Sequence, residues 1–267
     1  MQGAGIARLE RFGVVTSTQA IVREWLEAGE AELCVAVADE QTAGRGRLER
    51  SWQAPPRTSL LLSVGFRPVQ VPLMQTWRVA AVVTLAMREA ALEASGLVPA
   101  AIGLKWPNDL VGRDSDRWRK LAGVLSDGVP IDGRMAMLVV GIGVNVDWRR
   151  SGFPAELAED MTSLRELAGG RVVRRDGVLD RFLERIPVHY AALSRGDFDV
   201  GTWSEAQITT GADVSVDTGA GVISGHGEAP DPDTGELRVR DRSEGVLHSI
   251  SVGDVVRCRI DEVGPHL

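Results

Sequence analysis

The stretch LCVAVADEQTAGRGRLERSWQAPPRTSLLLSVGF, residues 33–66, sets a long polar segment between two apolar runs. The runs Leu33–Ala38 and Ser59–Phe66 have the length and composition of buried strands. The segment that joins them contains glycines, prolines and arginines and is longer than most connections within a domain. Because loops of this length in compact domains are usually functional or disordered, the stretch predicts a sheet that presents a candidate binding loop.

Apolar runs and helical stretches on both sides of this pair predict an α/β body. Thr16–Gln19 fits a capping box that would open a helix, and Gly29 would end that helix. Pro187 should kink the last helix of the body. The further elements expected along the chain are a helix at Pro72–Ser95, strands at Ile102–Trp106, Leu121–Leu125 and Met135–Ile142, and a helix at Asp176–Leu193.

After Gln207 the pattern changes to short alternating segments, separated by turn sequences such as PDPDTGE. Such a pattern is typical of a small all-β barrel. We therefore expect two domains, a body at residues 1–207 and a barrel at residues 208–267.

The composition excludes several classes of protein. A net charge of −7 over 267 residues argues against a protein that mainly coats nucleic acid, because neutralising phosphates requires a basic face. No apolar run reaches the ~18 residues of a membrane span, and no signal segment opens the chain, so we expect a cytoplasmic protein without membrane contact. The four histidines are scattered, and Cys34 and Cys258 lie far apart, which indicates neither a zinc site nor a disulfide framework.

Lysine and asparagine are nearly absent from this chain. The lysines are Lys105 and Lys120 and the asparagines Asn108 and Asn145, against 28 arginines. Since arginine supplies most positive charges, a remaining lysine is expected where a compact, flexible ammonium is required. This favours a functional role for Lys120 over a chance remnant, whereas Lys105 has a weaker case and a structural role is its alternative.

The loop sequence AGRGRLERSW, Ala43–Trp52, combines glycines with arginines. Glycine lets the backbone approach a ligand closely, and the forked donors of arginine suit phosphate or carboxylate oxygens. A solvated arginine-rich loop is the alternative, since no Walker pattern is present. Trp52 offers a flat face for stacking a nucleobase, or it serves as a core anchor.

Two further segments place polar side chains at strand ends. In KWPND, Asp109 is a candidate to hold a magnesium ion bridged to phosphates, with an ordinary β-turn as the alternative. The segment VVGIGVNV, residues 139–146, lacks the third glycine and the following helix of a dinucleotide fingerprint. Asn145 is therefore either a polar ligand or a turn former.

Five segments in this order, STQ, EQTAGRGRLERSW, GLKWPNDL, KLAGVLSD and GIGVNV, resemble the biotin protein ligase family. Each segment is weak by itself, but the order is specific, and the resemblance covers essentially the whole chain. It implies a class II synthetase-like α/β (α+β) catalytic domain with a mixed sheet, followed by a small SH3-like β-barrel.

The resemblance also implies roles for individual residues. Lys120 would touch the reacting carboxylate and the phosphate, Arg47 would contact phosphate, and Asp109 would be the acid on the magnesium side; these three form the implied catalytic set. The residues implied for ATP are Arg47, Arg50, Trp52, Asn108 and Asn145. Those implied for biotin are Ser17, Thr18, Gln19, Gln41, Gly44, Arg45, Lys120 and Gly123.

The activity implied is ATP- and magnesium-dependent biotinylation of a lysine on a biotin carboxyl carrier protein or domain of an acyl-CoA carboxylase, through biotinyl-5′-AMP. About ten residues precede Phe12, too few for a DNA-reading domain, so we expect the ligase-only form, as a monomer or weak homodimer. The alternatives are a lipoyl or octanoyl ligase or transferase of the related fold, and a catalytically silent biotin-binding sensor.

Two residues depart from the family pattern. Gln19 stands where the family usually has Asn, and capping the helix is the alternative to contacting the ligand. Glu49 stands where the family commonly has Gly, so we expect strain in the loop and slower closure.

Overall fold

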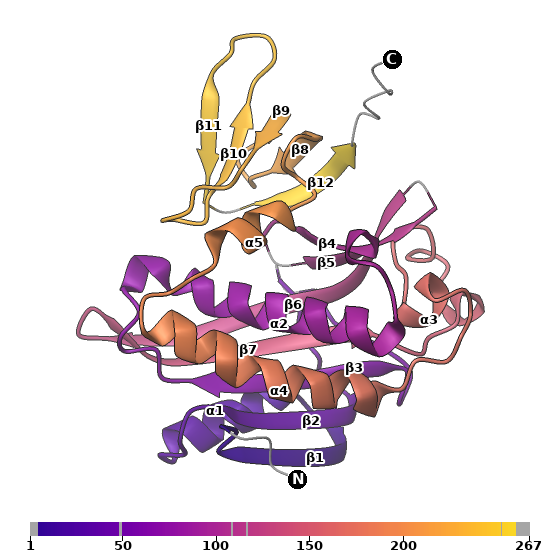
Figure 1. Ribbon diagram of the computed structural model, residues 1–267, viewed down its shortest axis with the longest axis vertical. Coiled ribbons are helices and arrows are strands. Elements are labelled where there is room, and N and C mark those ends of the chain that lie inside the picture. Colours follow the sequence, from indigo (N-terminus) through magenta and orange to yellow (C-terminus); the bar gives the residue numbers. More distant parts are fainter. Residues whose placement is uncertain (1–4, 48–49, 108, 116, 252, 260–267) are drawn as a thin grey trace. The chain divides into compact units, whose positions relative to one another are not determined.

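The computed structural model describes residues 5–47, 50–107, 109–115, 117–251 and 253–259 (Figure 1). The chain forms two compact units. The first unit consists of Met1–Ile102 and Asn108–Phe198, and the second of Gly103–Pro107 and Asp199–Leu267. The boundary expected after Gln207 falls within the second unit.

A mixed sheet forms the centre of the first unit, as the family resemblance implies. In this unit the strand order is β1-β2-β3-β7-β6-β5. β1 is parallel to β2, whereas the pairings β2–β3, β3–β7, β7–β6 and β6–β5 are antiparallel. The strands of this unit are β1 (Arg8–Val15), β2 (Cys34–Gln41), β3 (Ser59–Phe66), β5 (Asp109–Asp114), β6 (Arg117–Ile131) and β7 (Arg134–Asn145). The strand β4 (Ile102–Lys105) belongs to the second unit except for Ile102.

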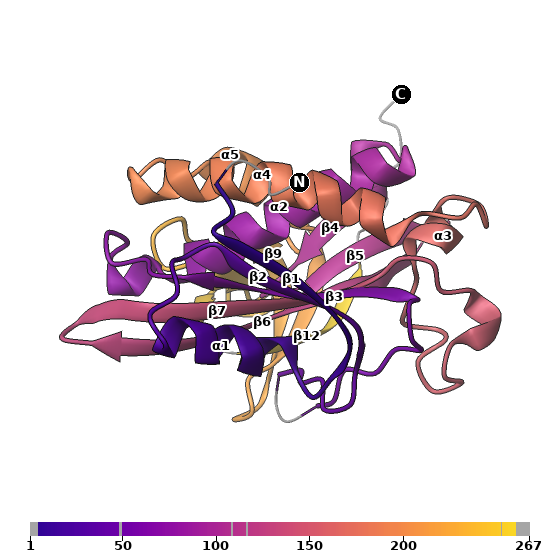
Figure 2. The same ribbon diagram turned by 90° about the horizontal axis from the view of Figure 1, so that it is seen from below.

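Helices cover both faces of this sheet (Figure 2). α1 (Thr18–Glu27) contacts β2, β3 and β7 on one face. α2 (Trp77–Ser95) and α4 (Arg175–Ser194) pack against each other on the opposite face, and α3 (Leu164–Leu167) is a short helix near β5. Because both faces are covered, β3 is buried along its whole length, which explains its continuous apolar sequence.

Several sequence-based expectations for this unit need correction. The strand at Ser59–Phe66 is confirmed, but β1 was not anticipated, because its half-exposed sequence RLERFGVV contains no apolar run. The capping box at the start of α1 is wrong, since Ser17 is the N-cap and makes no side-chain capping bond. α4 runs through Pro187, and the kink expected at this proline stays a prediction.

The second unit contains α5 (Val200–Glu205) and a five-stranded sheet in the order β11-β10-β9-β8-β12, with antiparallel pairings. Trp106 belongs to its core, and the indole Nε1 of Trp106 donates to the carbonyl oxygen of Gly235 at 2.9 Å. Closure of this sheet into an SH3-like barrel stays a prediction. The strands are β8 (Asp213–Asp217), β9 (Val222–Glu228), β10 (Leu237–Arg240), β11 (Leu247–Ile250) and β12 (Asp254–Arg259).

None of the helices in the described part of the chain combines the length and the apolar composition that a membrane span requires. Cys34 is a buried free thiol and Cys258 a half-buried one.

Candidate functional site

The start of α1 and the end of β2 form a partly buried polar cluster. The backbone N–H of Thr18 donates to Oε1 of Gln41 at 2.8 Å, and the Thr18 hydroxyl donates to the same oxygen at 3.1 Å. The Thr18 hydroxyl also lies 2.8 Å from Oγ of Ser63 on β3. The oxygen of the Gln41 amide is therefore used within the protein, and its nitrogen lies beside Gly44, where an added methyl group would be 3.2 Å away. The structure thus brings together Thr18 and Gln41, two of the residues that the family resemblance assigns to biotin.

Gln19 extends from α1 across the sheet instead of capping its helix. Its Nε2 donates to the carbonyl oxygen of Leu125 on β6 at 2.9 Å. A methyl group added to Gly141 on β7 would lie 2.9 Å from Cδ of Gln19. The longer side chain at this position therefore rests on a glycine and is fixed to β6.

Two paired glycines form a flat surface on the sheet, which we call the glycine floor. Gly123 on β6 faces Gly143 on β7, and the indole of Trp52 lies on both. Methyl groups added to Gly143 and Gly123 would lie 2.6 Å from Cε2 and 3.0 Å from Cζ3 of Trp52. Only residues without a side chain allow a ring to approach a sheet this closely.

The Trp52 indole is held there without its usual polar contact. Among the described residues, Nε1 of Trp52 is buried and has no hydrogen-bond partner. A buried indole N–H normally finds an acceptor, and leaving one unpaired costs free energy. The unpaired N–H therefore offsets part of the free energy that packing on the glycine floor contributes.

The loop that carries Trp52 folds back on itself. The N–H of Trp52 donates to the carbonyl of Gly44 at 2.9 Å, and the N–H of Gly46 donates to the carbonyl of Arg50 at 2.6 Å. A bridge between Arg45 and Ser51 completes this hairpin. Arg47 also lies on the hairpin. The strain and slower closure expected from Glu49 concern a position outside the described residues.

Lys120 and Asp109 meet at the edge of the glycine floor. Nζ of Lys120 lies 2.8 Å from Oδ1 of Asp109 on the neighbouring strand and 5.8 Å from the centroid of the Trp52 ring. The backbone of Lys120 pairs on its other side with the segment at residues 160–162. The side chain of Asp109 is 14% exposed and that of Lys120 42%, so the ammonium is the accessible member of the pair.

Asn145 is enclosed at the end of β7. Its Nδ2 donates to the carbonyl of Thr162 at 3.1 Å, and its Oδ1 accepts from the Ser59 hydroxyl at 3.2 Å. The residue is 2% exposed, so a nucleotide contact by this amide stays a prediction. The contact expected of Asn108 concerns a position outside the described residues, and Lys105 belongs to the second unit.

A magnesium ion at this site would depend on Asp109. Within the described residues, no three His, Cys, Asp or Glu side chains come together as a metal-binding cluster. Magnesium commonly takes one or two carboxylates and completes its shell with water and phosphate oxygens. Asp109 therefore fits as a protein ligand of an ion that arrives with a nucleotide, and this role stays a prediction.

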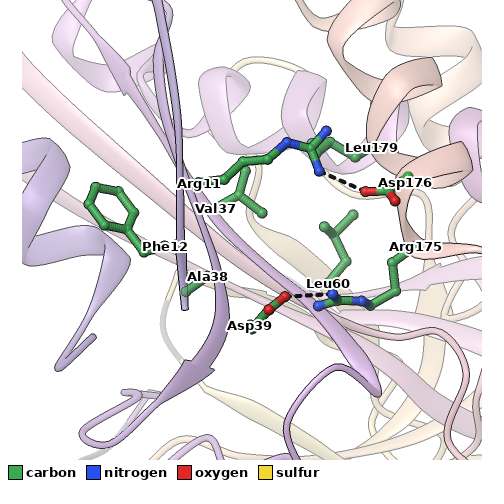
Figure 3. A pocket seen from close by; sticks show the side chains of 9 residues that line it. All are labelled: Arg11, Phe12, Val37, Ala38, Asp39, Leu60, Arg175, Asp176 and Leu179. Carbon is green, nitrogen blue, oxygen red and sulfur yellow. Dashed lines mark hydrogen bonds and ion pairs between the residues drawn. The ribbon is translucent and has the colours of Figure 1, made fainter. Parts of the chain in front are cut away.

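A separate hollow of about 30 Å³ lies between the sheet and α4 (Figure 3). Two ion pairs lie among its lining residues: Arg11 on β1 with Asp176 at 2.6 Å, and Arg175 with Asp39 on β2 at 2.6 Å. A hollow of this size holds about one water molecule, and no residue assigned to biotin, ATP or magnesium lines it. We therefore place the candidate site on the glycine floor.

Comparison with known proteins identifies the family of the chain that carries this site. Residues 12–145 match the Biotin/lipoate A/B protein ligase family. The chain belongs to that family. The matched residues include every position that the sequence assigns to biotin, ATP or magnesium.

Two curated relatives and one solved structure show how far the similarity to family members extends. The chain is 32% identical to the bifunctional ligase/repressor BirA of Bacillus subtilis over 170 residues, 64% of this chain and 50% of the relative. It is 32% identical to the biotin–[acetyl-CoA-carboxylase] ligase of Mycobacterium tuberculosis over 185 residues, 69% of this chain and 64% of that protein. The fold matches that of the biotin protein ligase of Aquifex aeolicus, which was solved in complex with biotin and ATP. The TM-score is 0.75 at 28% sequence identity, and the match covers 92% of this chain and 96% of that chain. The matches thus span about half to two thirds of the length of these curated relatives.

Sequence reasoning missed several residues of this family site. Gly143 was not singled out as part of the site, although a glycine inside a buried strand signals a close approach by another group. Ser63 and the segment at residues 160–162 carried no signal, because their contacts with Thr18 and Lys120 arise only from tertiary structure.

Proposed function

We propose that this chain is a biotin protein ligase, which uses ATP to attach biotin to a lysine of a biotin carboxyl carrier protein or domain through biotinyl-5′-AMP. The observation that carries the proposal is the exposed ammonium of Lys120, held 2.8 Å from Asp109 at the edge of the glycine floor. Membership in the ligase family and similarity to the Aquifex aeolicus enzyme with biotin and ATP support it.

The chemistry of the site residues matches the two ends of biotin. The neutral, partly buried cluster of Thr18 and Gln41 suits the uncharged ring system, whose polar groups both donate and accept hydrogen bonds. The glycine floor offers a flat apolar surface for the rings once Trp52 moves aside. Lys120 is the cation available to the carboxylate end.

In the first step, an oxygen of the biotin carboxylate attacks the α-phosphorus of ATP, and pyrophosphate leaves. Two anions approach each other, so positive donors that act on the developing charge lower the barrier. We assign this role to Lys120, with Arg47 and Arg50 of the hairpin contacting phosphate and Trp52 stacking on adenine. A magnesium ion held by Asp109 would neutralise phosphate charge when bound.

In the second step, the amine of an acceptor lysine attacks the acyl carbon of biotinyl-5′-AMP, and AMP leaves. The intermediate is a mixed anhydride that water hydrolyses, so the hairpin at residues 44–52 would protect it by excluding solvent. The proposed acceptor is a biotin carboxyl carrier domain. We further propose that the body and the C-terminal sheet act as a catalytic domain and an SH3-like domain, and that the reaction is cytoplasmic, where ATP is available.

The test is the exchange of labelled pyrophosphate into ATP in magnesium buffer, with biotin, with lipoate, and with neither. We expect exchange that depends on biotin. Exchange with lipoate alone would identify a lipoyl ligase, and no exchange by a folded protein that binds biotin would identify a silent sensor. Transfer to a purified carrier domain then tests the second step.

A further inference from the structure

A bulge in β6 determines which face of the sheet carries Lys120. Lys120 and Ala122 pair with consecutive residues of β5, so Leu121 is an extra residue on β6. Because side chains alternate along a regular strand, Lys120 and Gly123 would otherwise point to opposite faces. A methyl group added to Gly123 nevertheless would lie 3.5 Å from Nζ of Lys120. The bulge therefore turns Lys120 onto the face of the glycine floor.

The pairing between β6 and β7 stops before it reaches Lys120. It begins at Ala122, and the backbone of Lys120 is paired with another segment instead. The N–H of Lys120 donates to the carbonyl of Asp160 at 2.7 Å, and the N–H of Thr162 donates to the carbonyl of Lys120 at 2.9 Å. The segment at residues 160–162 therefore takes the place of β7 beside Lys120.

Asn145 connects this segment to the end of β7. Its Nδ2 donates to the carbonyl of Thr162 at 3.1 Å. Its Oδ1 accepts from the hydroxyl of Ser59 on β3 at 3.2 Å, which keeps the amide nitrogen turned toward the segment. Asn145 is 2% exposed and Ser59 1%, so a group left unpaired there would cost free energy. A line of hydrogen bonds thus runs from β3 through Asn145 and Thr162 to the backbone of Lys120.

The bulge makes this support necessary. A bulge interrupts the hydrogen-bond ladder and lets the strand bend. Without the segment at residues 160–162, the backbone of Lys120 would be paired only with Val111 of β5. The ammonium stands at the end of a flexible four-carbon stem, so a small rotation of the backbone moves it far. A group that acts on developing charge must be held within about 0.5 Å of its productive place.

We infer that Asn145 is a positioning residue that holds the segment at residues 160–162 against Lys120, and thereby keeps the ammonium at the edge of the glycine floor. The inference rests on the proposed ligase function for its kinetic consequences. Asn145 is enclosed between Ser59 and Thr162 and acts through Lys120. Its loss should therefore slow adenylation while leaving the affinity for ATP nearly intact.

Asn145→Ala removes the partner of the Thr162 carbonyl and of the Ser59 hydroxyl. We expect kcat for biotin-dependent pyrophosphate exchange to fall about 5- to 20-fold, because a displaced ammonium stabilises less of the charge that develops in the transition state. KM for ATP should stay within about twofold of the wild type. A direct contact between the Asn145 amide and the nucleotide predicts instead a raised KM for ATP with little change in kcat, and that result would overturn the inference.

A second variant carries the test if Asn145→Ala does not fold. Ser59→Ala keeps the amide of Asn145 but removes the bond that fixes its orientation, so kcat should fall about two- to fivefold at unchanged KM for ATP. Tyr190→Phe is the matched control, because it removes the hydrogen bond from another buried side chain, 2.7 Å long, to Glu32. It should retain the wild-type kcat. An unchanged kcat in Ser59→Ala, or an equal loss in Tyr190→Phe, would contradict the positioning role.

The place of Lys120 can also be followed without relying on activity. The chain has two lysines, so protein isotope-labelled at the ε-carbon of lysine gives two ε-carbon signals in an NMR correlation spectrum, and Lys120→Arg identifies the signal of Lys120. In Asn145→Ala this signal should move toward that of free lysine, while the signal of Lys105 in the second unit stays in place.

The NMR comparison separates the inference from the proposed function. A Lys120 signal that does not move in Asn145→Ala would overturn the positioning role. A wild-type protein without biotin-dependent pyrophosphate exchange would instead overturn the proposed function, and the movement of the Lys120 signal would still decide whether Asn145 holds this side chain in place.

Discussion

The ammonium of Lys120 and the carboxylate of Asp109 face each other across neighbouring strands, with Nζ and Oδ1 2.8 Å apart. Nζ also lies against Gly123, where an added methyl group would be 3.5 Å from it. A compact cation fits this space, whereas the planar guanidinium of arginine is larger and needs a different geometry. This explains why lysine is retained at position 120 in a chain that otherwise uses arginine almost throughout.

Lys120→Ala should lower kcat for biotin-dependent pyrophosphate exchange on the order of 10²- to 10³-fold, because the lost donor acts on charge that develops in the transition state. Lys120→Arg keeps the charge but should also remain well below the wild type. The matched control is Lys105→Arg, at the other lysine, which should exchange normally. Near-normal turnover by folded Lys120→Ala would contradict the role assigned to this ammonium.

Gly143→Ala should disturb the glycine floor. The new methyl group would lie 2.6 Å from Cε2 of Trp52, so the ring must move, and the surface proposed for biotin is narrowed. We expect a higher Kd for biotin in calorimetry and a loss of about 1–3 kcal/mol in the free energy of unfolding. Gly13→Ala is the control, because a methyl group at Gly13 meets open space. Equal biotin affinity in both variants would argue against the floor as the binding surface.

Trp52→Ala should affect the two substrates differently. If Trp52 stacks on adenine, its loss removes about 1–3 kcal/mol of stacking, equivalent to a rise in KM for ATP of roughly 5- to 160-fold. The affinity for biotin should not fall, because the same ring covers the glycine floor in the ligand-free protein. Trp52→Phe keeps an aromatic ring but removes the unpaired N–H, so this variant should retain most of the affinity for ATP. A parallel loss of biotin and ATP affinity would contradict this assignment.

The sequence predicted the elements whose burial is uniform along their length. β3 was recognised because both of its faces are covered and its residues are therefore apolar. β1 was missed because its exposure alternates irregularly and its sequence carries charges. The extension of β6 to Arg117–Ile131 was also missed, since only its buried centre is apolar. Local composition thus reports burial better than it reports strand length.

The site could be predicted only in part, because contacts between distant segments leave no local pattern in the sequence. The resemblance placed Thr18, Gln41 and Lys120 in one site, and the structure brings Thr18 to Gln41 and Lys120 to the glycine floor. It could not show that Gln19 reaches Leu125, because that bond spans the sheet and leaves no local pattern. Nor could it show that Asp127 lies beside Arg45, since a single acid in a strand is indistinguishable from a solvated charge.

The stability of the fold should depend on pH through Asp39. Burial, the largest single effect, raises the pKa of Asp39, but hydrogen bonds from Arg175 and Arg57 outweigh it and hold the pKa below its ordinary value. A carboxyl whose pKa is lowered by folding contributes stability that is present above its unfolded pKa of about 4 and is lost as the pH falls through the folded value. Asp39→Asn should therefore unfold at lower urea than the wild type at pH 7.

That difference should persist down to about pH 4 and shrink at lower pH, as the wild-type carboxyl takes up its proton. Urea unfolding followed by circular dichroism from pH 7 to about pH 3 measures the midpoints of both proteins. Asp132→Asn is a suitable control, because Asp132 is an exposed turn residue with a φ of 49° that asparagine also adopts. If the difference in urea midpoint between the wild type and Asp39→Asn stays constant from pH 7 to about pH 3, the charge of Asp39 does not contribute to stability. Arg57 and Arg175 would then stabilise the fold by packing, which does not depend on that charge.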